Sequence, residues 1–337
     1  MIIRALSRRV PALRRRVTGI ALTAGLAASL VGAAAGCGSP AASSATGAVA
    51  ASASAAGDAH ASGSFPVTIT AANGAVHVPS LPKAIMSLSP TATEMLYAIG
   101  AGGQVKAVDN DSDYPPQAPR TKLSGFDPNI EAIVAEQPDL VIVSFDASTL
   151  IKRLAAFSIP VLYLPAPTAL NGVYSEFDQL GKATGHTSQA AAEVASLRSQ
   201  ISKIVAAAPR HAKPLTYYYE LDQTYYSATS YTFIGKLLGL LGMKSIADSA
   251  RGAAAAGGYP QLSAEYIVKA NPDYIVLADS LCCHQNAATV AARPGWAGLV
   301  AVKDKHVIAL NDDIASRWGP RIVDLLRTVL AAIKGRQ

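Results

Sequence analysis

The chain has 337 residues, of which 50% are hydrophobic and 15% charged. This composition excludes a chain that is disordered throughout, and the length suits two lobes better than one. The net charge of +6 comes from the N-terminus, because six arginines and no acidic residue precede residue 37, which leaves 23 basic against 23 acidic residues elsewhere. Nucleic acid is excluded as a partner, since binding it needs clustered positive charge on a folded surface.

The first 36 residues have the pattern of an export signal. Arginines are followed by an apolar run from Val17 to Val31, which is short for a membrane span. The run Ala34-Ala35-Gly36-Cys37 is similar to the lipobox of bacterial lipoproteins, although Ala34 stands where leucine is usual. We predict a signal peptide over residues 1–36 and lipidation of Cys37. A non-cleaved anchor or an ordinary secretory signal is the alternative, and the export route, Sec or twin-arginine, stays open.

A tether is predicted over residues 37–64, because alanine, serine and glycine make up almost all of it. Such a coil has a root-mean-square span of about 30 Å. It would hold a folded body clear of the membrane to which Cys37 is attached. The predicted location is therefore the extracytoplasmic face of the cell membrane, with the protein lipid-anchored.

The folded body is predicted to begin with a β-hairpin. Val67–Thr70 and Ala75–Val78 flank Asn73-Gly74, a pair of residues that favours a tight turn. A buried strand over 84–88 follows. Ser89-Pro90 then provides a cap and a first-turn proline for a helix that runs to about residue 99.

Beyond this helix, short β-branched runs alternate with helical stretches. The runs are Leu140–Val143, Val161–Leu164, Ile275–Leu277 and Val307–Leu310. The alternation favours α/β layers with mostly parallel strands. Between the second and third runs, a helix around Val173–Leu180 precedes a segment from Gln189 to Ala208 without glycine or proline, which predicts a rod about 30 Å long.

An internal repeat divides the body in two. Residues 129–143 and 263–277 match at an offset of 134 residues, with the identical pairs Glu131 and Glu265, Pro138 and Pro272, and Asp139 and Asp273. Each copy is typical of a capped short helix, a proline and a buried strand. A repeat at this distance indicates two related lobes.

The predicted fold is therefore α/β, with two Rossmann-like lobes of mostly parallel strands joined by one long rigid helix. The N-terminal lobe covers 65–172, the connecting helices 173–209 and the C-terminal lobe 210–337.

Six short segments stand at characteristic places in this layout: Ser87–Glu94, Ser112–Ala118, Pro128–Glu131, Pro138–Leu140, Ser263–Glu265 and Arg317–Arg321. Together they resemble the class III solute-binding proteins of bacterial ABC importers, the Fe/B12 periplasmic-binding family, over residues 65 to 334. The segment 112–118 is most similar to the cobalamin-binding member. The resemblance implies a receptor, and no enzyme, that delivers a bulky metal-bearing nutrient to a permease dimer. The cargo is cobalamin, a ferric siderophore or haem, and no resident cofactor or metal is expected.

In that family, one exposed glutamate per lobe pairs with arginines of the permease. By position these are Glu131 and Glu265, and two carboxylates on separate lobes could dock a rigid body by charge complementarity. The alternative is that each glutamate only complements the dipole of its own helix, with Asn129 and Ser263 as caps.

The ligand is expected beyond the carboxyl ends of the parallel strands. Aromatic and polar side chains there are the candidate ligand-binding residues: Tyr114, Phe126, Tyr226, His284, Arg317 and Trp318. The aromatic pattern of the cobalamin-binding member is only partly kept. Asp111, Gly125 and Ile314-Ala315 stand where aromatics are expected, and Phe126 follows Gly125 directly.

The run Cys282-Cys283-His284 has two interpretations. In an oxidising compartment, the adjacent cysteines could form a structural disulfide or be two buried thiols. In the functional interpretation, His284 or a thiolate is an axial ligand to the cobalt or iron of the cargo.

Two other classes of protein are the alternatives. A zinc- or manganese-binding uptake lipoprotein needs histidines and carboxylates that converge from both lobes, and only His284 is well placed. An extracytoplasmic Cys/His enzyme needs a nucleophile and a base that face each other, whereas Cys283 and His284 are neighbours on an extended segment. We expect a monomeric binding protein with a small-molecule metal-chelate ligand.

Overall fold

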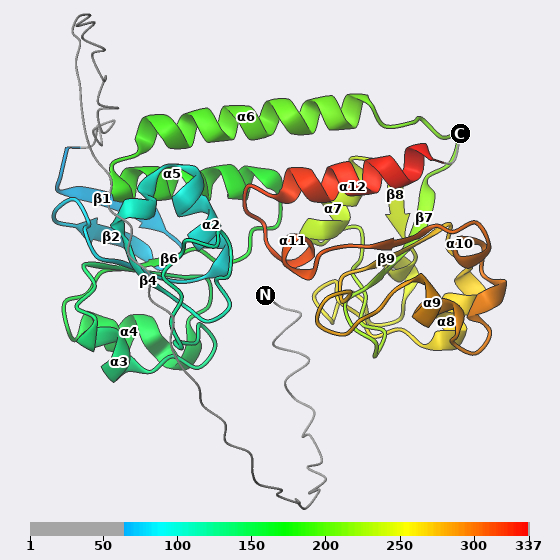
Figure 1. Ribbon diagram of the computed structural model, residues 1–337, viewed down its shortest axis with the longest axis horizontal. Helices are drawn as coiled ribbons and strands as arrows, with labels where there is room; N and C mark the ends of the chain where they lie inside the picture. Colours follow the sequence, from blue (N-terminus) through cyan, green and yellow to red (C-terminus); the bar gives the residue numbers. More distant parts are fainter. Residues whose placement is uncertain (1–63, 336–337) are drawn as a thin grey trace, which may run out of the picture. The chain divides into compact units, whose positions relative to one another are not determined.

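The computed structural model describes residues 64–335 (Figure 1). The predicted signal peptide at 1–36, lipidation of Cys37 and almost all of the tether at 37–64 lie outside these residues. Among the helices from residue 64 onward to 335, none has both the length and the apolar character needed to cross a bilayer.

An antiparallel hairpin opens this part of the chain, formed by β1 (Val67–Ala71) and β2 (Gly74–Val78). It confirms the predicted hairpin. Ile69 and Val76 lie opposite each other and are both buried. Gly74 has a φ of +96°, a conformation that favours glycine and allows the sharp reversal. The Asn73 side chain donates a hydrogen bond to the Val161 carbonyl oxygen at 2.9 Å, which fastens the turn to the lobe.

The sheet of the N-terminal lobe has four parallel strands in the order β4 (Val105–Val108), β3 (Ile85–Leu88), β5 (Leu140–Val143) and β6 (Val161–Tyr163). Its helices and 3-10 helices are α2 (Pro90–Ala98), η1 (Ala101–Gln104), α3 (Ile130–Ala135), η2 (Ala147–Thr149) and α4 (Leu150–Ala155). Along β3, Ile85 faces one buried cluster while Met86 and Leu88 face another. Both faces of the sheet are covered, as its continuous apolar runs predict.

The C-terminal lobe repeats this sheet with β8 (Met243–Ser245), β7 (Leu215–Glu220), β9 (Tyr274–Leu277) and β10 (Val307–Ala309). Its helices and 3-10 helices are α7 (Phe233–Gly239), η3 (Ile246–Ser249), α8 (Ala264–Ala270), α9 (Ala287–Ala291), η4 (Trp296–Gly298), α10 (Val300–Lys303), α11 (Asp312–Ser316) and α12 (Ile322–Lys334). Tyr217 and Tyr219 pack on one face of the sheet and Tyr218 on the other.

The duplication predicted from the repeat is present in the topology. Matching β3 with β7 and β5 with β9 gives the same strand order in both sheets. The aspartate of each repeat also makes an equivalent hydrogen bond. Asp139 accepts a hydrogen bond from the backbone N–H of Ala84 at the start of β3, at 3.1 Å, and Asp273 accepts one from the N–H of Thr216 in β7, at 2.9 Å. Each Pro-Asp turn thereby holds the first strand of the parallel sheet in its lobe.

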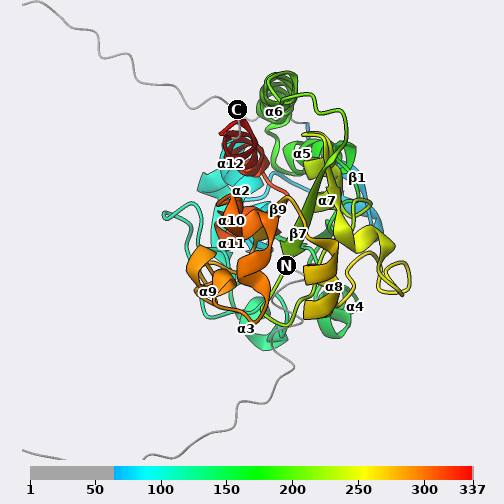
Figure 2. The same cartoon turned by 90° about the vertical axis from the view of Figure 1, so that its right-hand side faces the viewer.

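Two helices, α5 (Leu170–Thr184) and α6 (Thr187–Ala206), lie between the lobes in the chain and side by side in space (Figure 1). The first is longer than predicted, whereas α6, of 20 residues, corresponds to the predicted rod. They approach closely because Gly181 has no side chain: a Cβ there would lie 2.6 Å from the Cβ of Ala190. On its other side, α6 contacts α12 of the C-terminal lobe (Figure 2).

A single cluster of buried apolar side chains continues from one lobe to the other. It includes Leu96 of the N-terminal lobe, Phe177 of α5, Leu197 of α6 and Tyr219 of the C-terminal lobe. Large relative motions of the lobes would expose this apolar surface to water, which is unfavourable. The fold therefore favours a modest opening of whatever site lies between the lobes.

Candidate functional site

Apolar side chains stand exposed on the segments that follow the parallel strands. Phe145 follows β5, Tyr231 follows β7 and Leu281 follows β9, and their exposed fractions are 50%, 49% and 57%. Phe126, on the segment after β4, lies 6.5 Å from Phe145 between ring centroids. Ligands of open α/β sheets bind at this end of the strands, so these residues mark the candidate site.

A cavity of about 250 Å³ lies at this end of the C-terminal lobe. It is bounded by the segment after β6, by the start of α7 and by the residues around α11. The wall is mainly apolar and aromatic, and it includes Pro167, Tyr231, Phe233, Tyr259, Ile314 and Trp318. Such a wall suits a large, partly apolar ligand that is oriented by a few polar groups.

A second, much smaller cavity of about 20 Å³ lies directly between the lobes. Pro90, Thr91, Asp111 and Phe126 of the N-terminal lobe line one side, and Asp313, Ser316 and Arg317 line the other. Arg317 also lines the larger cavity, so one residue borders both spaces. Phe126, Arg317 and Trp318 are thus the sequence candidates that border these cavities.

Arg317 is held by acidic and carbonyl oxygens of both lobes. Its Nη1 donates to Oε1 of Glu94 at 2.9 Å. Its Nη2 donates to the backbone oxygen of Asp111 at 2.9 Å, to Asp113 at 2.7 Å and to Asp313 at 2.8 Å. The arginine is 8% exposed, so its charge is compensated by protein groups rather than by water.

A second arginine reinforces this junction. Arg321, which precedes α12, donates from Nε to Oε2 of Glu94 at 2.8 Å and from Nη2 to Oε1 at 2.5 Å. Its guanidinium carbon lies 4.1 Å from the ring centroid of Tyr114. Tyr114, which is 43% exposed, therefore contacts the inter-lobe ion network rather than either cavity.

Trp318 links the C-terminal lobe to α5 through a buried hydrogen bond. Its Nε1 donates to Oε2 of Glu176 on α5 at 2.7 Å, and both side chains are buried. Burial raises the pKa of Glu176 to about 8, although the hydrogen bond from Trp318 opposes this shift. Trp318 thus presents one side to the larger cavity and anchors the other to α5.

Buried carboxyls also lie below the strand ends. Burial, together with the charge of Glu220, raises the pKa of Asp279 to about 8. Glu220 is fully buried and accepts two hydrogen bonds from Arg293, at 2.5 and 2.6 Å. Burial raises the pKa of Asp109, in the N-terminal lobe, to about 6. Neither Asp109 nor Asp279 lines either of the two cavities.

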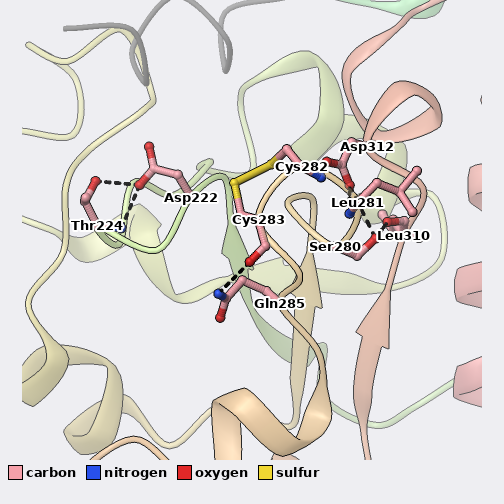
Figure 3. Close-up of a disulfide and its surroundings, with 9 residues drawn as sticks. All are labelled: Asp222, Thr224, Ser280, Leu281, Cys282, Cys283, Gln285, Leu310 and Asp312. Carbon is pink, nitrogen blue, oxygen red and sulfur yellow. Dashed lines mark hydrogen bonds between the residues drawn. A yellow bond between two sulfur atoms is a disulfide. The ribbon is translucent and has the colours of Figure 1, made fainter. Parts of the chain in front are cut away.

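Cys282 and Cys283 form a disulfide on the segment after β9 (Figure 3). Asp312, the first residue of α11, accepts hydrogen bonds from the backbone N–H groups of Leu281 and Cys282, at 2.8 and 2.7 Å. His284 follows the disulfide with an exposed side chain and a φ of +57°. It borders neither cavity, and its role as an axial ligand stays a prediction.

Tyr226 occupies a different environment from the other candidates. It is half-buried, packs against the main apolar cluster and pairs with Gln261 through the backbone. It borders neither of the two cavities described above. Its contact with ligand therefore stays a prediction.

Sequence reasoning missed Tyr231, Tyr259, Glu94 and Glu176. One signal could have found Glu176, because it stands on the same helical face as the buried Val173, Phe177 and Leu180. A carboxylate within an apolar stripe needs a partner, which here is Trp318. Glu94 had no such local signal, since its arginine partners lie more than 200 residues away.

Glu131 and Glu265 are exposed in the first turns of α3 and α8. Asn129 and Ser263 cap these helices, as predicted, by accepting hydrogen bonds from the backbone N–H groups of the third residue beyond each. Hydrogen bonds from its own backbone N–H and from Ser263 lower the pKa of Glu265. Helix α3 and helix α8 both lie at the lower edge of the view in Figure 1.

Within residues 64–335, no three His, Cys, Asp or Glu side chains come together as a possible metal site. The zinc- or manganese-binding alternative therefore has no ligand cluster in this part of the chain.

Comparison with known proteins agrees with this architecture. The chain matches the model of the family described as periplasmic binding protein over residues 85–314. It is 32% identical to an uncharacterized ABC transporter substrate-binding lipoprotein, YvrC, of Bacillus subtilis, with 77% of this chain and 83% of the relative covered. It is also 32% identical to a cobalamin-binding protein of Halobacterium salinarum, covering 79% of this chain and 74% of the relative.

A solved structure is similar over both lobes. A possible iron-binding periplasmic solute-binding protein of Staphylococcus epidermidis superposes with a TM-score of 0.65 at 25% identity, covering 75% of this chain and 99% of that one. With the duplicated sheets and the cavities at their carboxyl ends, these matches lead to one conclusion: the chain belongs to the periplasmic binding protein family.

Proposed function

We propose that the protein is the extracytoplasmic receptor of an ABC importer, which captures a bulky metal-bearing small molecule between its lobes and delivers it to a permease. The observation that carries the proposal is the aromatic cavity at the carboxyl ends of two duplicated parallel sheets, in a chain of the periplasmic binding protein family. Its relatives at 32% identity are named as a substrate-binding lipoprotein and a cobalamin-binding protein, which supports binding rather than catalysis.

The charges of the site favour a corrinoid among the three candidate cargos. Among the described residues that line the two cavities, Arg317 is the single cation, and it is already paired with Glu94, Asp113 and Asp313. A haem brings two carboxylates and a ferric catecholate brings several negative charges, which would meet no unpaired cation there. The rim of a corrinoid carries neutral amides, which can bond to the carboxylates and hydroxyls of the site.

The size of the larger cavity is compatible with part of such a ligand. At about 250 Å³ it lies near the lower end of sites for drug-sized molecules. A corrinoid ring would therefore extend beyond it, across the rims that Phe126 and Phe145 form on the opposite lobe. Contact with both lobes would then stabilise the closed arrangement.

Equilibrium titration of the purified full-length protein tests the ligand. Cyanocobalamin, haemin and a ferric catecholate are each added at constant pH, and heat and thermal stability are recorded. We expect one-to-one binding of cyanocobalamin, no turnover, and a melting temperature that rises with ligand concentration. If haemin or the catecholate binds instead, that compound and not a corrinoid is the cargo. If none of the three binds, the receptor proposal is overturned.

Docking to the permease is proposed for Glu131 and Glu265. The support is that both are exposed, occupy equivalent positions in the duplicated lobes and begin helices at the same edge of Figure 1. The combined change Glu131→Ala and Glu265→Ala should abolish uptake in cells while leaving the Kd for ligand unchanged. Glu136→Ala, which removes an exposed glutamate at the other end of α3, is the matched control. Uptake that persists in the double variant would leave the glutamates only the role of complementing the dipoles of their own helices.

Anchoring at Cys37 is proposed from the lipobox-like run, together with the lipoprotein name of the Bacillus subtilis relative. Mass spectrometry of the mature protein from membranes tests it: the N-terminal residue should be a diacylated cysteine. The variant Cys37→Ser should lose the lipid and leave the membrane fraction. An unmodified N-terminus elsewhere in the chain would contradict the anchor.

A further inference from the structure

An exposed apolar tip stands on the loop that carries the disulfide. The loop runs from residue 280 to 286 after the carboxyl end of β9. Among the large apolar side chains of the described residues, Leu281 is the most exposed, at 57%, and Cys282 beside it is also exposed. A single exposed apolar residue is common on protein surfaces, so exposure alone does not identify a site; the position and the bracing of this tip distinguish it.

The tip is braced from the side of α11 (Figure 3). Both carboxylate oxygens of Asp312 are used: Oδ1 accepts from the N–H of Leu281 at 2.8 Å and Oδ2 from the N–H of Cys282 at 2.7 Å. The hydroxyl of Ser280 donates to the backbone oxygen of Leu310. These bonds orient the backbone of the tip relative to the residues that follow β10.

The tip is braced from the opposite side by a buried ion pair. Gln285 donates from Nε2 to the backbone oxygen of Cys283 at 3.1 Å, and its Oε1 accepts from Nη2 of Arg293 at 2.7 Å. Arg293 in turn is paired with the fully buried Glu220 of β7. The disulfide between Cys282 and Cys283 further restricts the backbone of the loop between the hydrogen bonds to Asp312 and the hydrogen bond from Gln285.

The braced tip adjoins the wall of the candidate site through Asp312, although Leu281, Cys282 and Cys283 line neither cavity themselves. Asp312, which holds the tip, is followed by Asp313, Ile314 and Ser316, which line one or other of the two cavities. We propose that Leu281 and the Cys282–Cys283 disulfide form a preformed apolar subsite that contacts the transported ligand on the wall of the C-terminal lobe. The inference rests on the proposed function and specifies one part of its binding site.

Two physical arguments favour this role. A loop that is already ordered loses little conformational entropy when a ligand binds, so its contacts contribute more to affinity. Sulfur is also polarizable and makes favourable contacts with flat conjugated rings. A leucine beside a disulfide therefore suits the face of a large ring, whereas a polar loop at this place would suit a small hydrated solute.

Titration with cyanocobalamin tests the subsite, and the wild-type protein is measured first. If the wild type binds, Leu281→Ala should raise the Kd about five- to tenfold, and the double change Cys282→Ser with Cys283→Ser should raise it by a similar factor. Phe157→Ala is the matched control, because Phe157 is 54% exposed but lies between α4 and β6, at the amino end of that strand rather than at the carboxyl ends where the site lies; its Kd should stay within about twofold of wild type.

The outcomes separate the subsite from the function. Wild-type affinity in both variants would overturn the subsite while leaving the receptor proposal intact, and so would a loss of uptake without a change in Kd. If the wild type does not bind cyanocobalamin, the same variants are titrated with haemin. Absence of binding to both ligands would overturn the subsite together with the function. Should the double serine variant fail to fold in a thermal melt, Leu281→Ala decides alone.

Discussion

The carboxylate of Glu94 and the guanidinium of Arg317 form an ion pair of 2.9 Å between residues 223 positions apart in the chain. Glu94 belongs to α2 of the N-terminal lobe, and Arg317 follows α11 of the C-terminal lobe. Both side chains are almost fully buried. The pair therefore joins the two lobes beside the candidate ligand site.

Replacing Glu94 by Gln tests how much this junction contributes to stability. Loss of the carboxylate removes the acidic partner of Arg321, while Arg317 keeps Asp113 and Asp313, so the cost should be about 3 kcal/mol, the lower end of the range for breaking a buried pair. The free energy of unfolding should fall by this amount in urea or guanidinium titrations. Asp178→Asn, which breaks the exposed pair with Lys182, should cost less than about 1 kcal/mol. Equal effects of both changes would mean that burial of the Glu94 network is unimportant.

Glu176 predicts a specific dependence of stability on pH. Burial raises its pKa to about 8, so the folded protein keeps this proton where the unfolded chain has lost it. Its stabilising contribution is therefore complete below about pH 4 and decreases as the pH rises towards 8.

Glu176→Gln keeps an oxygen for the Trp318 N–H but cannot ionise. Between pH 5 and pH 8, the free energy of unfolding should fall less in this variant than in the wild type, by on the order of 1–3 kcal/mol. Chemical denaturation at both pH values measures the difference. Asp178→Asn on the same helix should follow the wild-type profile, and so should Glu176→Gln if the carboxyl is ionised in the folded protein.

Gly125 explains why an aromatic residue cannot stand at that position here. A Cβ on Gly125 would lie 2.5 Å from the backbone oxygen of Leu88 and 2.9 Å from Oδ2 of Asp109. Gly125→Ala should therefore reduce the melting temperature by several degrees, since overpacking costs about 1–3 kcal/mol. Gly103→Ala, where a Cβ would meet no atom within 4 Å, should leave it nearly unchanged. Unchanged stability of Gly125→Ala would show that the backbone around Leu88 shifts enough to accommodate the added Cβ.

Phe126 and Tyr231 test whether the ligand contacts both lobes. One lines the small cavity from the N-terminal lobe and the other lines the large cavity from the C-terminal lobe. Each change to Ala should raise the Kd for cyanocobalamin about tenfold, and the effects of the double variant should add because the sites are separate. An effect confined to Tyr231→Ala would restrict the ligand to the C-terminal lobe.

Features with a local cause were predictable from the sequence. The hairpin around Asn73, the caps at Ser89, Asn129 and Ser263, and the buried runs of the strands are all present as predicted. Each depends on residues within a few positions of one another, so the chain carries the information in a short window. The repeat centred on Asp139 and Asp273 extended this reasoning to the order of the strands, because equal segments fold into equal units.

The candidate site was predictable only in outline. The rule that ligands bind at the carboxyl ends of strands identified Phe126, Arg317 and Trp318, which border the cavities. The same rule offered Tyr114, Tyr226 and His284, which border neither of these cavities and whose contact with ligand stays a prediction. A side chain at the end of a strand can point to the ligand, the core or the solvent, and its neighbours decide which.

The sequence by itself thus determined the family, the duplicated α/β plan and the positions of the exposed glutamates, Glu131 and Glu265. Only the tertiary structure decided that Glu94 neutralises Arg317, that Gly125 has no room for a side chain, and that Asp312 braces the disulfide loop. The physical reason is distance along the chain: caps and periodicity act between neighbours, whereas ion pairing and steric exclusion depend on segments that folding brings together.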